Sequence, residues 1–177
     1  MGTPADALSI DVNVESPLWQ AQPGAEAAVR RALGVAAAMV STRPAELAIV
    51  LTDDSAVRAL NREWRGIDKP TNVLSFPARG PQALAAEPAH SAPPMLLGDI
   101  VIAFETTAQE ARTESKRFED HLAHLAVHGY LHLLGHEHED DGDAEAMEGL
   151  ERAILARLSI PDPYAASDLV HTAGPNA

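Results

Sequence analysis

Apolar and polar positions alternate in one part of the chain and form unbroken apolar runs in others, and both patterns predict strands. Residues 8–15 (LSIDVNVE) alternate, which is typical of a strand with one buried face. Residues 47–52 (LAIVLT) form a short apolar run, as expected for a more deeply buried strand. Two further segments, 72–76 (NVLSF) and 96–104 (LLGDIVIAF), predict a third and a fourth strand.

Between these segments the apolar residues return every three or four positions, which is the spacing of one face of a helix. This pattern predicts helices from about residue 24 to 40, 53 to 64, 107 to 134 and 143 to 158. Prolines at positions 161 and 163 then end the last helix, because proline cannot continue the helical hydrogen-bond pattern.

The chain has 177 residues and 46% hydrophobic content, enough for one domain with a real core. We predict a single domain at 8–160, a frayed N-terminus at 1–7, a mobile Pro- and Ala-rich loop at 78–95, and a disordered tail at 161–177. The chain contains no cysteine, which excludes disulfides and thiolate metal ligands. No apolar run approaches the roughly 18 residues of a membrane span, so we expect a soluble, cytoplasmic protein without membrane contact.

Charge narrows the possible partners. The formal net charge of −13 argues against binding of nucleic acid by bulk charge, so an RNA or DNA partner requires a local basic patch. Such a patch exists between positions 55 and 80, where five cationic residues face only two acidic ones, Glu63 and Asp68. The five are Arg58, Arg62, Arg65, Lys69 and Arg79.

A histidine cluster at residues 128–139 (HGYLHLLGHEHE) carries the clearest chemistry. Two histidines four positions apart on a helix can reach one ion at about 2.0–2.1 Å, and either His124 with His128 or His128 with His132 satisfies this spacing. Gly135 follows the helical pattern and can end the helix, after which the chain can return His138 to the same ion. Three nitrogen ligands with an open fourth position are typical of a catalytic zinc site.

The spacing HxxxHxxGxxH resembles the metzincin signature, HExxHxxGxxH, in its three ligands and its glycine. Gly129, however, stands where that signature carries the glutamate that acts as general base, so peptide hydrolysis by that route is disfavoured. A glycine here leaves space, either for something beside the metal or for tight packing of the helix on the sheet. His136 is the nearest candidate for a general base, whereas His121 and His124 are expected to make ordinary hydrogen bonds.

Four segments in the same order along the chain resemble the YbeY family of bacterial endoribonucleases associated with ribosomal RNA maturation. They are NREWRGIDKPTNVLSFP (61–77), LGDIVI (97–102), HGYLHLLGHEH (128–138) and MEGLERAILARL (147–158). The resemblance implies an α+β fold, with a small mixed four-stranded sheet, about five helices and a metal site at the end of a central helix. The chain departs from the family in two places. Glu137 stands where the family commonly has Asp, and the loop at 78–94 has a length and composition of its own.

The same resemblance implies a function and a set of residues. It implies one Zn2+ per chain on His128, His132 and His138, and the family's functional arginine at Arg65, in an enzyme that cuts single-stranded RNA, matures 16S rRNA and serves ribosome quality control. The zinc would activate water or polarise a phosphoryl oxygen while Arg65 stabilises phosphate charge, with His136 as candidate base. The implied partners are rRNA, small-subunit ribosomal proteins and an assembly GTPase, with no DNA. Two alternatives stay open: an assembly factor with structural zinc, and a metallopeptidase.

Overall fold

The computed structural model describes residues 8–40, 43–78 and 94–165. The frayed N-terminus predicted at 1–7, most of the loop predicted at 78–95 and residues 166–177 of the predicted tail lie outside these ranges. Residues 161–165, at the start of that tail, are described, and there Tyr164 is half-buried.

Four strands form one mixed sheet. They are β1 (Leu8–Val14), β2 (Ala45–Thr52), β3 (Val73–Pro77) and β4 (Met95–Ala103). The order across the sheet is β1-β2-β4-β3. Strands β1, β2 and β4 are parallel neighbours, and the short edge strand β3 runs antiparallel to β4. The predicted small mixed sheet of four strands is therefore confirmed.

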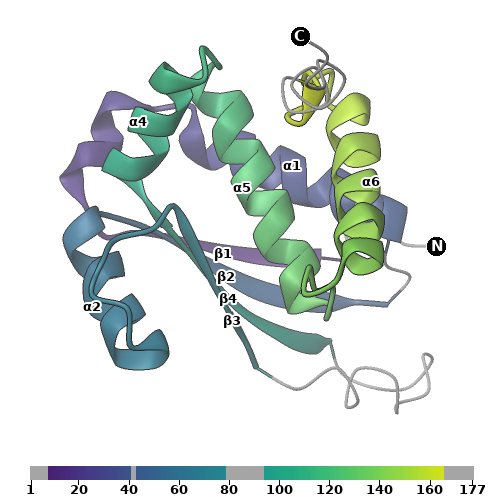
Figure 1. The fold of residues 1–177 in the computed structure, drawn as a ribbon, viewed down its shortest axis with the longest axis horizontal. Coiled ribbons are helices and arrows are strands. Elements are labelled where there is room, and N and C mark those ends of the chain that lie inside the picture. Colours follow the sequence, from purple (N-terminus) through teal and green to yellow (C-terminus); the bar gives the residue numbers. More distant parts are fainter. Residues whose placement is uncertain (1–7, 41–42, 79–93, 166–177) are drawn as a thin grey trace, which may run out of the picture.

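Helices cover both faces of this sheet unequally. Four of them, α1, α4, α5 and α6, lie together on one side, while α2 lies alone on the other (Figure 1). The large core on the first side includes Ile49 and Ile100 of the sheet and Val127 of α5, and a smaller core under α2 is built around Val57 and Leu74. The described helices are α1 (Ala25–Val40), α2 (Asp54–Arg65), α4 (Phe104–Thr113), α5 (Phe118–Leu133) and α6 (Asp141–Arg157), with a 3-10 turn, η2 (Pro17–Ala21).

The single helix predicted at 107–134 is wrong, because the chain breaks into α4 and α5. Ser115 adopts a left-handed conformation with φ of 54°, and the N–H of Lys116 donates to the carbonyl of Ala111 at 2.8 Å. This closure ends α4 and lets the chain change direction, so that both helices bury their apolar faces. Because no glycine or proline marks the break, the helical spacing of apolar residues predicts one continuous helix across it.

The 3-10 turn η2 was not predicted. Ser16 caps it, and its Trp19 side chain is only 3% exposed. The indole N–H of Trp19 donates to the carbonyl of Thr52 at 2.8 Å, and its ring packs edge-on against Phe104 and Phe118. This tryptophan therefore belongs to the core.

Helix α5 is the central helix of the molecule. It contacts α1, α4 and α6 as well as β3 and β4. Most of its side chains are buried, including Leu122, Ala126 and Leu131. A helix fixed on so many sides holds the side chains at its C-terminal end in place, and the histidine cluster lies there.

Candidate metal centre

The C-terminal end of α5 and the turn after it bring three histidines together. His128 and His132 are four residues apart on α5 and both are half-buried. Gly135 has a φ of 95°, a left-handed conformation that glycine adopts without strain, and it turns the chain back. His138, exposed on the returning segment, then joins the other two.

The geometry of these rings fits a metal ion. One ligand atom from each of His128, His132 and His138 lies within 4.8 Å of the others, and the Nε2 atoms of His128 and His132 are 3.0 Å apart. Two imidazole nitrogens that share a tetrahedral ion at about 2.0–2.1 Å are about 3.3 Å apart. The structure thus assembles His128 with His132, rather than with His124, and adds His138 as the third candidate ligand.

A buried carboxylate orients the first of these rings. Glu151, on α6, is 0% exposed, and its Oε1 lies 2.5 Å from Nδ1 of His128. An ionised carboxylate can only accept hydrogen bonds. Nδ1 of His128 therefore carries the proton, and this N–H donates a hydrogen bond to Glu151. The Nε2 lone pair of His128 is therefore left for the metal, the arrangement by which proteins fix the tautomer of a ligating histidine.

Two more groups hold Glu151 in its ionised form. His124 Nε2 lies 3.0 Å from Oε2 of Glu151, and the hydroxyl of Tyr164 donates to the same oxygen. Burial alone would raise the pKa of Glu151, but the hydrogen bonds from His124, His128 and Tyr164 outweigh it and lower that pKa to about 2. Burial, and then the bond to Glu151, raises the pKa of Tyr164, so the phenol keeps its proton.

The surroundings of His132 lower its pKa and so favour its neutral form. Burial lowers its pKa, and positive charge on His128 or His138 lowers it further. A histidine binds a metal through a neutral imidazole, so this shift favours the ligand form.

The cluster lines a cleft of about 550 Å³. Arg65 lines the same cleft from the last residue of α2, where Gly66, with a φ of 70°, ends the helix. Arg65 is exposed and forms no ion pair with any other residue that the structure describes. The cleft residues are Trp64, Arg65, Val73, Leu74, Ser75, Phe76, Pro77, His128, His132, Glu137, His138 and Glu139.

Gly129 is explained by packing. A Cβ atom at this position would lie 2.9 Å from Cγ2 of Ile100 and 3.2 Å from Oγ of Ser75, both closer than normal contact. The Ser75 hydroxyl also donates to the carbonyl of Gly129 at 3.2 Å. Of the two readings of this glycine, the structure therefore favours close packing of α5 on the sheet.

The other sequence candidates are placed differently. The side chain of His136 is half-buried and is not among the cleft residues, so its role as a base stays a prediction. Arg58 is engaged by Asp68 through two hydrogen bonds of 2.9 and 3.2 Å, which removes it from the basic patch. Glu151 was missed because it contacts His128 from 23 residues away, and Tyr164 was missed because it reaches the cluster only through its contacts with Glu151 and His124. One signal existed, since Glu151 is a charged residue on the inward face of α6.

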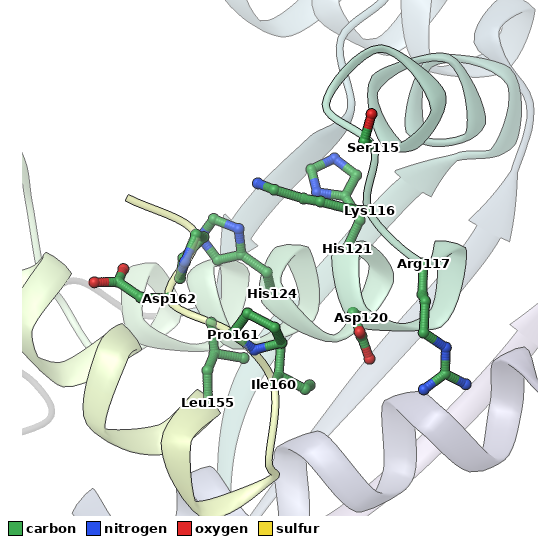
Figure 2. Close-up of a pocket in the computed structure, with 11 residues that line it drawn as sticks. Ser115, Lys116, Arg117, Asp120, His121, His124, Leu155, Ile160, Pro161 and Asp162 are labelled. Carbon is green, nitrogen blue, oxygen red and sulfur yellow. The ribbon is translucent and has the colours of Figure 1, made fainter. Parts of the chain in front are cut away.

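His121 and His124 line a second, smaller hollow of about 260 Å³. It lies between the N-terminal half of α5 and the segment after α6, near Ile160 and Pro161 (Figure 2). His121 is buried, with Nε2 at 3.6 Å from Glu110, and His124 is tied to Glu151. Neither histidine joins the three-histidine group.

This α+β fold brings three histidines, two on its central helix and one on the segment after it, to an open cleft where they could hold a metal ion, and sites of this kind are common in hydrolytic enzymes. Comparison with known proteins narrows the class. Residues 13–159 match the family model described as Endoribonuclease YbeY, and the chain belongs to that family. Membership confirms the prediction of an enzyme of the endoribonuclease class.

Relatives support the same assignment. The chain is 56% identical to the Endoribonuclease YbeY of Rhodopseudomonas palustris strain BisB18 over 163 residues, 91% of this chain and 95% of the relative. It is 57% identical to that of Nitrobacter winogradskyi over 157 residues, 88% of this chain and 81% of the relative. The solution structure of TM1509 from Thermotoga maritima shares the fold, with a TM-score of 0.55, 20% identity and coverage of 95% and 99%.

The sequence predicts no membrane-spanning segment. Within the described ranges no helix has the length and apolar character needed to cross a membrane.

Proposed function

We propose that this chain is a zinc-dependent endoribonuclease that cuts single-stranded RNA. The observation that carries the proposal is that His128, His132 and His138 line one cleft together with Arg65. Three nitrogen donors beside an open cleft suit a catalytic ion better than a structural one, which usually has four protein ligands. Imidazole also accepts other divalent metals, so zinc is the proposed identity rather than the only chemical fit.

Arg65 binds the scissile phosphate in this proposal. Its guanidinium donates two parallel hydrogen bonds to phosphate oxygens, and it is available because no described residue pairs with it. Its positive charge stabilises the extra negative charge that the phosphate gains in the transition state. A bound zinc ion supplies Lewis acidity toward a phosphoryl oxygen or toward water.

Proton transfer has three candidates on this chain. His136 was the candidate from the sequence, and it does not line the cleft. Glu137 and Glu139 do line the cleft, and a carboxylate there is within reach of bound substrate. Separate His136→Ala, Glu137→Gln and Glu139→Gln variants discriminate them, because only loss of the proton acceptor removes the rise in rate on the acidic side of the pH–rate profile.

The proposed setting is the cytoplasm, with 16S rRNA maturation and ribosome quality control as the process. Its partners there would be rRNA, small-subunit proteins and an assembly GTPase. The support is the family resemblance, together with relatives that carry the name endoribonuclease. A non-catalytic assembly factor with structural zinc is the main alternative, while a metallopeptidase is disfavoured because Gly129 supplies no base.

The decisive experiment combines metal content with RNA cleavage. Wild type, His128→Ala and the exposed-surface control Glu145→Gln are purified identically, analysed for metals and incubated with a single-stranded RNA. We expect one zinc per chain and cleavage in wild type and control, and loss of both in His128→Ala with its circular dichroism unchanged. Loss of zinc with an unchanged cleavage rate would favour the assembly-factor alternative or a contaminating nuclease.

A further inference from the structure

Trp64 is an exposed aromatic side chain at the catalytic cleft. It is 67% exposed, whereas the other tryptophan of the chain, Trp19, is 3% exposed. An exposed tryptophan that lines a cleft leaves its aromatic face available for a ligand to stack on. Trp64 lines the cleft that the histidine cluster also lines.

The ring is held in place on one side. Trp64 meets Phe76 of β3 with ring centroids 6.0 Å apart and planes at 64°, an edge-to-face contact. Phe76 is itself half-buried and packs against the small core under α2. The contact limits the motion of the indole, while its large exposed fraction leaves ring surface open to a ligand.

Two exposed arginines lie close to Trp64 in the sequence, although Glu63 precedes it directly and Glu137 and Glu139 line the same cleft. Arg65 follows it directly, and Arg62 is exposed on the preceding turn of α2. Asp68, the nearest acid in the sequence after them, is already bound to Arg58. An aromatic ring beside cationic groups is the combination that binds single-stranded nucleic acid, in which bases stack on the ring and phosphates meet the cations.

We propose that Trp64 is a stacking platform for a nucleobase of single-stranded RNA, positioned beside the phosphate that Arg65 binds. This inference rests on the proposed function and names the feature of the substrate that the cleft selects. In a duplex both faces of a base are covered by its neighbours, whereas an unpaired base offers its face to a side chain. Trp64 therefore accounts for a preference for single strands.

The test measures binding separately from cleavage. The full chain is kept in a chelator so that RNA stays intact, and binding of a labelled oligo(A) 12-mer is followed by anisotropy. Three variants are compared with wild type: Trp64→Phe keeps an aromatic face, Trp64→Leu keeps apolar volume only, and Leu18→Ala removes a different exposed apolar side chain outside the cleft. Tryptophan emission is recorded in the same titration.

We expect Trp64→Leu to weaken binding by about 5- to 100-fold, the range for loss of one stacked base. Trp64→Phe and Leu18→Ala should bind within about threefold of wild type, since a smaller ring still stacks. RNA should quench the emission of wild type and leave that of Trp64→Phe unchanged, because its remaining Trp19 is buried. The oligo(A)·oligo(U) duplex should bind more weakly and without quenching.

Other results would overturn the proposal. Equal binding by Trp64→Leu and wild type, or equal loss in Trp64→Phe and Trp64→Leu, would exclude stacking. If the duplex quenched the tryptophan emission as strongly as the single strand does, a preference of Trp64 for single strands would be excluded. A further outcome is that wild type binds RNA with quenching but cuts no RNA once it is loaded with zinc. This outcome would reject the nuclease proposal and would still support Trp64 as a stacking platform.

Discussion

The carboxylate of Glu151, which is fully buried, lies 2.5 Å from the imidazole of the half-buried His128 and so joins α6 to α5. Isolated, a buried carboxylate would be strongly unfavourable. Here His124 and Tyr164 complete its hydrogen bonds, so the negative charge is stabilised where it faces a candidate metal ligand. Glu151 therefore links α6, whose apolar face packs in the core, to a candidate metal ligand in the cleft.

Replacing Glu151 by glutamine should weaken metal binding while keeping the fold. The amide has nearly the same volume but no charge, so it orients His128 less firmly and adds less to the basicity of Nε2. We expect zinc affinity to fall by about 10- to 100-fold, the usual effect of removing such a partner. Competition with a fluorescent chelator measures it, with Glu145→Gln on the same helix as the matched control. Equal affinities in the two variants would contradict the role assigned to Glu151.

His138 and His136 should differ in their response to zinc. A ligand that binds only the folded protein stabilises it, by about 2.7 kcal/mol at a free concentration 100 times Kd. Zinc should therefore raise the Tm of wild type and of His136→Ala, and raise that of His138→Ala much less. Differential scanning calorimetry with and without zinc checks this. A Tm rise that is lost in His136→Ala and kept in His138→Ala would exchange the two assignments.

Gly129 and Gly149 form a natural pair for testing the packing of α5. Both lie inside helices, where alanine is favoured over glycine by about 1 kcal/mol. Gly149→Ala meets nothing within 4 Å and should stabilise the protein by up to that amount. Gly129→Ala must displace Ile100, and overpacking costs about 1–3 kcal/mol, so a net destabilisation is expected. Urea unfolding of both variants decides, and a stabilised Gly129→Ala would refute the close contact.

The sequence predicted what depends on local spacing. Four strands follow from alternating or continuous apolar patterns, and the grouping of His128, His132 and His138 follows from their spacing, a glycine that ends the helix and the family resemblance. What it did not predict depends on tertiary contacts. Glu151 meets His128 across 23 positions, and no local pattern specifies that meeting. The only hint lay in α6, where Glu151 occupies the same face as Met147 and Ile154, a position where a charge needs a buried partner.

The break between α4 and α5 illustrates the same limit. Ser115 takes a left-handed conformation although serine is not specifically favoured there, because closing α4 lets two helices bury apolar faces in different directions. The exposure of Trp64 could not be predicted from the sequence either. Its position in α2 allowed either burial or exposure, and only the packed structure separates Trp64 from Trp19.

Arg65 and Arg62 should affect the reaction in different ways. Both are exposed on the last turns of α2, but only Arg65 lines the cleft. If Arg65 stabilises charge in the transition state, Arg65→Ala should lower kcat at saturating RNA by about 10²- to 10³-fold, the typical cost of losing one such donor. Arg62→Ala should leave kcat unchanged and weaken binding only, with a shallower dependence on salt because one phosphate contact is lost.

Single-turnover cleavage of one RNA at two salt concentrations separates these effects for the two arginines. Lysine at position 65 adds a further check, because it keeps the charge but donates no parallel pair of hydrogen bonds. Arg65→Lys should therefore recover part of the lost kcat. An Arg65→Ala variant with the kcat of wild type would confine Arg65 to binding, and the charge in the transition state would then have to be met by the metal centre.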